Sequence, residues 1–333
     1  MSERITASAP GKVVLSGEYA VLEGAPAVCM AVNRRAVVVI AETSEDHHVV
    51  VAPGHVDEPR RFRIRDDAFD WIDASDEFKL LEHAWRASGI SRQGGLSLRL
   101  ETGAFLDRER GRKIGVGSSA ALSVALASAL GELKPGQRDP MTVAHASHLD
   151  FQGGRGSGVD IATSGMGGLV EYRMADRAAS RLSMPAGLEY RLIWSGSPAS
   201  THRKLEHLSG IDPQASVAAL GSSAQRMASA WESGSASEVL NGYRDYIETL
   251  QVFSADHGLG VFDAGHEELT ARAARAGLVY KPCGAGGGDI GVLMSDNAAS
   301  ADEFIAKSVP DGFRLLDLQL DEQGAQVQRV SNE

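Results

Sequence analysis

Residues 113–121 read Lys-Ile-Gly-Val-Gly-Ser-Ser-Ala-Ala, and this stretch decides the fold more than any other. Gly115 and Gly117 stand one residue apart, and such glycines let the backbone turn sharply and expose successive N–H groups. Residues 118–133 are small and apolar almost throughout, which predicts a helix that is buried on most sides. The unpaired amides and the positive dipole end of that helix form a site for a di- or triphosphate.

The same residues have a plainer interpretation, a Gly-Ser cap in front of a buried helix. The spacing matches neither the Walker pattern nor the dinucleotide fingerprint, so the loop needs support from elsewhere in the chain. A serine hydroxyl at its end offers an oxygen to Mg²⁺ or to a phosphate. The predicted nucleotide-binding residues are Lys113, Gly115, Val116, Gly117, Ser118, Ser119 and Ala120, with Ser119 as the metal ligand.

The composition is that of an ordinary globular protein, 43% hydrophobic and 23% charged over 333 residues. A net charge of −11 argues against nucleic acid as a partner, because a phosphate backbone is bound by a basic face. No run reaches the roughly 18 apolar residues of a membrane helix, and residues 1–10 lack the apolar core of a signal peptide. We therefore expect a cytoplasmic monomer or homodimer without a membrane partner. Cys29 and Cys283 lie far apart, and we expect no disulfide between them.

The order of the predicted elements indicates an α+β protein of two intimate halves, residues 1–180 and 181–333. The first half combines strands and helices, with strands at 5–9, 13–16, 27–32, 36–42, 49–52, 61–65, 96–101 and 169–172, and helices at 78–88, 118–133 and 141–151. The second half has a strand at 190–195, a largely helical stretch at 213–277 with breaks near 234 and 258–260, strands at 279–281, 290–294 and 313–320, and a helix at 299–308.

Three segments in order resemble the motifs of the GHMP kinases, the group named for galactokinase, homoserine, mevalonate and phosphomevalonate kinases. The first runs from Pro10-Gly11-Lys12 through Gly17-Glu18-Tyr19-Ala20-Val21. The second is the phosphate loop, and the third, residues 281–289, reads Lys-Pro-Cys-Gly-Ala-Gly-Gly-Gly-Asp. The resemblance implies the GHMP kinase fold, with a ribosomal S5-like α/β half and a ferredoxin-like α+β half around a central cleft. It also implies an enzyme that uses ATP and Mg²⁺ to phosphorylate a small anionic substrate.

Several details are similar to phosphomevalonate kinases in particular. Residues 17–19 read Gly-Glu-Tyr where mevalonate kinases carry Gly-Glu-His, and the glycine-rich third motif ends in Gly-Ala-Gly-Gly-Gly-Asp. Residues 148–160, which begin His-Leu-Asp-Phe-Gln-Gly and end Gly-Ser-Gly-Val-Asp, and residues 194–201, Trp-Ser-Gly-Ser-Pro-Ala-Ser-Thr, resemble that subfamily as well. The implied reaction is phosphomevalonate to diphosphomevalonate in the mevalonate pathway of isoprenoid biosynthesis. The chain is short for the subfamily, so a mevalonate kinase or another GHMP kinase is the alternative. A decarboxylase-type relative and a non-catalytic nucleotide sensor are more distant ones.

The resemblance places the family's catalytic aspartate at Asp160, whose plainer interpretation is a helix cap. It places Lys12 between the acceptor and the γ-phosphate, where negative charge converges. Because a phosphate acceptor is already ionised near neutral pH, Asp160 can act mainly by orienting the substrate or a lysine. Mevalonate kinases carry a glutamate eleven residues before this aspartate, where the chain has Leu149, and the neighbouring Asp150 is a candidate to replace it. His145 and His148 have a spacing compatible with a metal, although packed or exposed histidines are the more common case.

An anionic acceptor needs hydroxyl, amide or cationic partners. Glu18 either binds a substrate hydroxyl or orders its turn, since its charge would repel an anion. Residues 197–204 are expected at a strand-to-helix junction, another anion site, while Arg203 and Lys204 fit a solvated helix face equally well. The predicted substrate-binding residues are Glu18, Tyr19, Arg155, Ser157, Ser197, Ser200, Thr201, Gly286 and Gly287.

Overall fold

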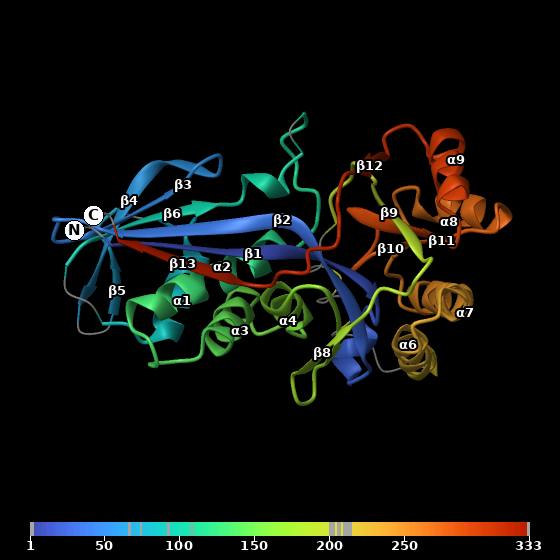
Figure 1. Cartoon of the computed structure of the whole chain (residues 1–333), viewed down its shortest axis with the longest axis horizontal. Coiled ribbons are helices and arrows are strands. Elements are labelled where there is room, and N and C mark those ends of the chain that lie inside the picture. Colours follow the sequence, from blue (N-terminus) through green and yellow to red (C-terminus); the bar gives the residue numbers. More distant parts are fainter. Residues whose placement is uncertain are drawn as a thin grey trace.

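The computed structural model describes residues 3–65, 68–73, 75–91, 94–107, 109–199, 204, 208 and 215–331. These residues form two sheets, each with its own helices, placed side by side along the long axis (Figure 1). The architecture is the α+β fold that the sequence predicts. In the described part of the chain, no helix has the length and apolarity needed to cross a bilayer.

The first sheet has nine strands in the order β13-β1-β2-β6-β3-β4-β5, with β7 paired to β2 and β8 to β7. Its pairs are antiparallel except for β3 with β6. The strands are β1 (Glu3–Ser16), β2 (Ala27–Glu42), β3 (His48–Ala52), β4 (Val56–Arg65), β5 (Ala68–Trp71), β6 (Leu96–Glu101), β7 (Leu169–Arg173), β8 (Ala178–Leu182) and β13 (Gln326–Ser331). A short 3-10 helix, η1 (Ala20–Glu23), follows β1, and another, η2 (Gly103–Phe105), follows β6.

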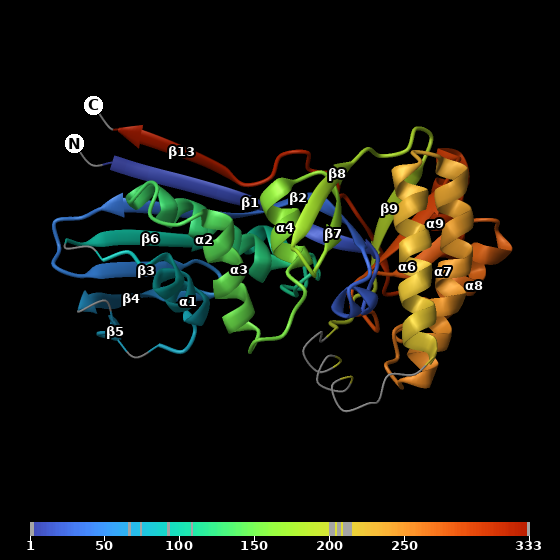
Figure 2. The ribbon, with the colours of Figure 1, turned by 90° about the horizontal axis from the view of Figure 1, so that it is seen from below.

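Four helices cover one face of this sheet, α1 (Lys79–Ser88), α2 (Ser118–Leu133), α3 (Pro140–Phe151) and α4 (Val159–Met166), as Figure 2 shows. The core between them joins sheet residues such as Ile40 and Leu98 to Trp85 of α1 and Leu126 of α2. α2 begins and ends at the residues that its small apolar composition predicts. Because alanine and serine are small, this helix can lie close under the sheet and bring its N-terminus to the sheet's centre.

The second sheet has the order β10-β11-β9-β12 and is antiparallel, with β9 (Glu189–Trp194), β10 (Val279–Pro282), β11 (Ile290–Ser295) and β12 (Arg314–Leu316). Helices α6 (Ala215–Glu232) and α7 (Ala236–Asp256) pack on one face, and α8 (His266–Arg275) and α9 (Ala298–Ser308) pack on the other. Alternation in β9 shows why both faces are covered: Leu192 and Trp194 join the α6–α7 side, whereas Ile193 joins the α8–α9 side.

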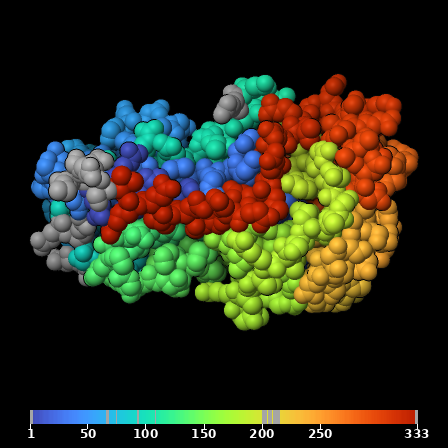
Figure 3. All heavy atoms as spheres, in the orientation of Figure 1, coloured from blue at the N-terminus to red at the C-terminus, as the bar shows by residue number. Residues whose placement is uncertain are grey.

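Several features of the first sheet differ from the predicted elements, among them β5 and β8, which were not predicted. β1 and β2 are each one long strand where two short ones were predicted, because a register shift at Pro10–Gly11 absorbs the proline without ending the strand. The last strand, β13, was not predicted, and it returns from the second half to pair with β1. Figure 3 shows this C-terminal segment crossing the face of the molecule to the far end of the first sheet. A division into domains near residue 180 stays a proposal, with β8 ending at Leu182 and β9 beginning at Glu189.

Candidate active site

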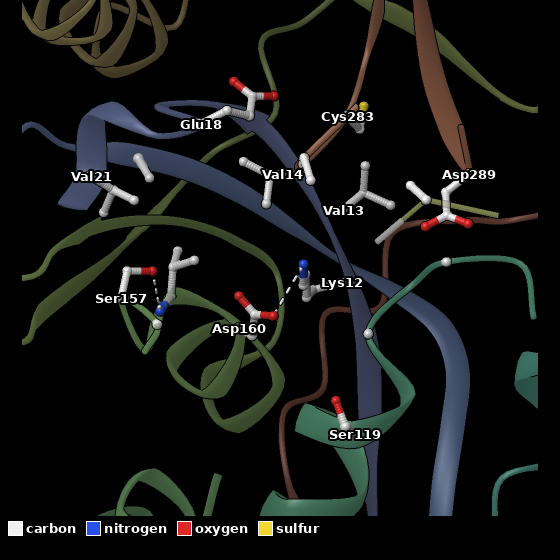
Figure 4. Close-up of a pocket in the computed structure, with 18 of the residues that line it drawn as sticks. Lys12, Val13, Val14, Glu18, Val21, Ser119, Ser157, Asp160, Cys283 and Asp289 are labelled. Carbon is white, nitrogen blue, oxygen red and sulfur yellow. Dashed lines mark hydrogen bonds and ion pairs between the residues drawn. The ribbon is translucent and has the colours of Figure 1, made fainter. Parts of the chain in front are cut away.

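A pocket of about 350 Å³ lies where the two halves meet. Its lining comes from all three motifs and from the glycine-rich turn that leads into α4 (Figure 4). Among the predicted site residues, those that line it are Lys12, Glu18, Tyr19, Lys113, Gly115, Gly117, Ser118, Ser119, Ser157 and Asp160. Segments far apart in the chain therefore converge on one cavity.

The centre of the pocket holds an ion pair between Lys12 and Asp160, with Nζ and Oδ2 3.3 Å apart. Lys12 follows the irregularity in β1, and its backbone N–H donates to the carbonyl of Val116 in the phosphate loop at 2.9 Å. Asp160 lies in the first turn of α4, whose N-cap is Gly158 at φ 85°, so Asp160 itself does not cap the helix. The two side chains keep 13% and 28% of their surface exposed, enough for a ligand to reach them.

The charges of this pair are stabilised by their proximity. Burial opposes ionisation of Asp160, but attraction by Lys12 and hydrogen bonding outweigh it, so the pKa of the carboxyl lies below its usual value. Burial likewise opposes the charge of Lys12, and Asp160 more than offsets it, so the pKa of the ammonium is raised. Near neutral pH the pocket therefore presents a protonated lysine held by an ionised carboxylate.

The phosphate loop has the geometry that its glycines predict. Gly115 and Gly117 have φ of 84° and 75°, and Gly117 is the N-cap of α2. Gly115 also permits a close approach, because a Cβ there would lie 2.4 Å from Cγ of Asp289 in the third motif. Val116 and Ala120 are buried, so their contribution to the loop is structural, while the backbone and hydroxyls of residues 117–119 face the cavity. Lys113 is exposed at the pocket's edge.

His148 is a pocket residue that the sequence interpretation treated as packing. It lies on α3, is 3% exposed, and its Nε2 is 3.1 Å from Oγ of Ser119. Burial is the main cause that lowers the pKa of the imidazole, so the ring is neutral near pH 7. His148 lies on the buried side of α3 with Val143, Ala144 and Ser147, and the packing of α3 against α2 brings it to Ser119.

Of the described carboxylates that line this pocket, Glu18 and Asp160 are each paired with a lysine, and the third is Asp289. Ser119 Oγ is the side-chain oxygen at the helix N-terminus next to His148. Asp150 lies elsewhere, 65% exposed and 3.9 Å from Nδ1 of His83. Within the described ranges, no group of three or more His, Cys, Asp or Glu side chains is arranged to hold a metal. The residues present fit an ion carried mainly by nucleotide phosphates and water, with Ser119 as its protein contact.

The turn after β1 carries Glu18 and Tyr19, two of the predicted substrate-binding residues. Glu18 is buried, and its carboxylate pairs with Lys281 of β10 and accepts a hydrogen bond from the Tyr246 hydroxyl at 2.7 Å. Tyr19 has φ of 62°, and its hydroxyl donates to the carbonyl of Ala285 at 2.6 Å. Of the two roles that the sequence offered for Glu18, ordering the turn is the one these contacts favour.

The remaining predicted substrate residues have other surroundings. Arg155 is exposed outside the pocket lining, and the carbonyl of Ser197 accepts from the N–H of Asp289 at 2.7 Å. Gly286 and Gly287 pack against residues 260–261 and Lys204, while Gly284 and Ala285 line the cavity in their place. Lys204 Nζ donates to the carbonyls of residues 260, 285 and 286. Ser200 and Thr201, with the neighbouring 202–203, lie outside the described residues.

Comparisons with known proteins agree with this architecture. Residues 79–168 match the family described as GHMP kinases N terminal domain. The chain is 30% identical over 346 residues to a phosphomevalonate kinase of Streptomyces sp. (strain CL190), covering 90% of this chain and 91% of that one. It is 27% identical over 316 residues to a mevalonate kinase of Archaeoglobus fulgidus, covering 93% and 99%. A solved structure of Streptococcus pneumoniae phosphomevalonate kinase with phosphomevalonate and AMPPNP shares the fold at a TM-score of 0.77 and 19% identity, covering 95% and 99%.

The chain belongs to the GHMP kinases. Within that family its similarity to a phosphomevalonate kinase extends over nearly the whole length of both chains.

Proposed function

We propose that this protein transfers the γ-phosphoryl group of ATP to phosphomevalonate and releases diphosphomevalonate and ADP. The observation that carries the proposal is the Lys12–Asp160 pair, 3.3 Å apart, in one cavity with the N-terminus of α2. The phosphomevalonate kinase relative supports the choice of acceptor, since it matches 90% of the chain at 30% identity.

In the proposed reaction, a phosphate oxygen of the acceptor attacks the γ-phosphorus, and the bond from that phosphorus to the bridging oxygen of ADP breaks. Such a transfer is promoted chiefly by positioning and by neutralising charge. The amides at residues 117–119 hold the nucleotide phosphates at the positive end of α2. Lys12 donates to oxygens of the acceptor and the transferred group, where negative charge accumulates.

The proposed acceptor, a phosphate, needs no strong base at this site. A carboxylate with a depressed pKa is a weak base near neutral pH, and an ionised phosphate oxygen has no proton to give up. Asp160 then holds Lys12 charged and directed into the cavity. A magnesium ion bound with the nucleotide would supply further charge neutralisation, with Ser119 Oγ as its contact on the protein.

The second candidate is phosphorylation of mevalonate, which the similarity to the Archaeoglobus fulgidus mevalonate kinase supports. An assay that couples ADP release to a chromophore, run with each acceptor separately, distinguishes the two. We expect kcat/KM to be much larger with phosphomevalonate. Faster turnover of mevalonate would overturn the choice of substrate. If ADP is released with neither acceptor, both proposed activities are wrong.

A further inference from the structure

We propose that Glu18 and Lys281 form a charge-cancelling pair beside the acceptor, so that the turn after β1 does not repel an anion. The pair joins residues 263 apart in the chain, one in each half of the molecule. It rests on the proposed function only in requiring that the acceptor be an anion.

The pair is more deeply buried than the Lys12–Asp160 pair at the centre of the pocket. The side chains of Lys281 and Glu18 are 0% and 2% exposed. Glu18 Oε1 faces Nζ of Lys281, and Oε2 accepts from the hydroxyl of Tyr246 at 2.7 Å. That hydroxyl in turn accepts the N–H of Gly17 at 2.9 Å. Both carboxylate oxygens therefore have partners in the second half of the molecule.

The turn that carries Glu18 needs such support, because its backbone is unusual. Gly17 has φ of 89°, and a Cβ there would lie 2.4 Å from the carbonyl oxygen of Pro26. Tyr19 adopts φ of 62°, which costs energy for a residue with a side chain. Its hydroxyl donates to the carbonyl of Ala285, which lines the pocket. The turn is thus tied at Lys281, Tyr246 and Ala285 to the segments that form the opposite wall.

The pair affects acceptor binding through the charge of the Glu18 carboxylate. Glu18 is among the pocket-lining residues, and Figure 4 shows its carboxylate directed away from Lys12 and Asp160. An unpaired carboxylate here would repel an anionic acceptor. The ammonium of Lys281 lies against this carboxylate and neutralises its charge. The expected effect is on the order of tenfold in binding, for two unit charges roughly 10 Å apart at an effective dielectric of about 20.

The test uses Lys281→Met, Glu18→Gln and the double variant in the full chain. We measure the KM of the acceptor that the wild-type enzyme turns over, and the Kd for AMPPNP by calorimetry, at a temperature where each variant is folded. Lys281→Met should raise the acceptor KM by about tenfold, and Glu18→Gln, which leaves the charge of Lys281 uncancelled, should lower it. The double variant, with both charges removed, should return to within about twofold of wild type. The Kd for AMPPNP should change by less than about threefold in all three.

A purely structural role predicts a different pattern. It would raise the acceptor KM in both single variants alike, raise the Kd for AMPPNP in parallel, or leave the double variant no better than the worse single one, and each of these results would overturn the proposal. If Lys281→Met does not fold, Glu18→Gln is compared with the double variant. These two differ only in the charge of Lys281, and the double variant must have the higher acceptor KM. Because mevalonate and phosphomevalonate are both anions, failure of the proposed substrate leaves this test intact.

Discussion

Two lysine–carboxylate pairs meet at this pocket, and they differ in burial and in what surrounds them. Lys12 and Asp160 keep 13% and 28% of their side chains exposed and face the phosphate loop. Lys281 and Glu18 are sealed at 0% and 2%, and Tyr246 completes their hydrogen bonding. A pair that must act on a ligand has to remain reachable, whereas a pair that holds two halves together gains strength from exclusion of water. We propose that the same chemical pairing serves reaction in one place and assembly in the other.

The largest expected difference between the pairs is in stability. Lys281→Met leaves Glu18 charged and unpaired in the interior, so we expect the free energy of unfolding to fall by about 3–5 kcal/mol. Lys12→Met breaks a pair that solvent partly reaches, and we expect a loss of about 1 kcal/mol or less. Denaturant titration of both variants measures the contrast. Equal losses would mean that burial does not distinguish the pairs.

Catalysis should show the reverse order. Lys12→Met removes the charge next to the transferred group, so we expect kcat to fall by about 10²- to 10³-fold with little change in nucleotide affinity. Asp160→Asn should behave in the same way but more mildly, because Lys12 is retained. Lys307→Met, on an exposed helical lysine, is the matched control and should leave kcat unchanged. An active Lys12→Met enzyme would remove the mechanism proposed here.

A buried histidine beside the third motif, His266, allows the stability of the second half of the molecule to be tested by pH. His266 is fully buried, with Nδ1 2.8 Å from the hydroxyl of Tyr280 and Nε2 3.1 Å from the carbonyl of Gly288. Burial lowers its pKa to about 4 from an ordinary 6.5, so the unfolded chain binds the proton more tightly. The stability contributed by the neutral ring is complete above pH 6.5 and is lost as the pH falls from there to about 4, by about 3 kcal/mol.

Unfolding free energies of wild type and His266→Gln across that pH range test this. The variant should lose most of the pH dependence, while His55→Gln, on an exposed histidine, should keep it. An unchanged slope in His266→Gln would assign the acid sensitivity to another group.

The smallest effect concerns His148, which lines the same pocket as the Lys12–Asp160 pair. His148→Leu removes the group that contacts Ser119 Oγ, and we expect a loss in kcat/KM of about tenfold, the value of one hydrogen bond that orients a hydroxyl. His148→Gln can restore the contact and should recover part of the activity. If the two residues act as a unit, combining His148→Leu with Ser119→Ala should cost no more than Ser119→Ala alone. Additive losses would separate their roles, and His55→Leu serves as the control.

The sequence predicted those parts of the site that depend on local chemistry. The glycines at 115 and 117 and the small residues after them specify a turn and a close-packed helix wherever they occur, and α2 has the predicted bounds. The resemblance to a known family supplied Lys12 and Asp160, whose catalytic roles stay predictions. By contrast, β13 was missed because its mixed residues, Gln-Val-Gln-Arg-Val-Ser, gain strand structure from pairing with β1. The contact between His148 and Ser119 was also beyond a local pattern, since it joins two separate helices.

By itself, the amino-acid sequence determined a sharp glycine turn, a buried helix behind it and an α+β order of elements, because these follow from backbone freedom and side-chain size within a few residues. Only the tertiary structure decided that Glu18 faces Lys281, and that two similar ion pairs have different exposure. Burial and pairing across 263 residues depend on how the two halves pack against each other, and no local stretch of sequence encodes that arrangement.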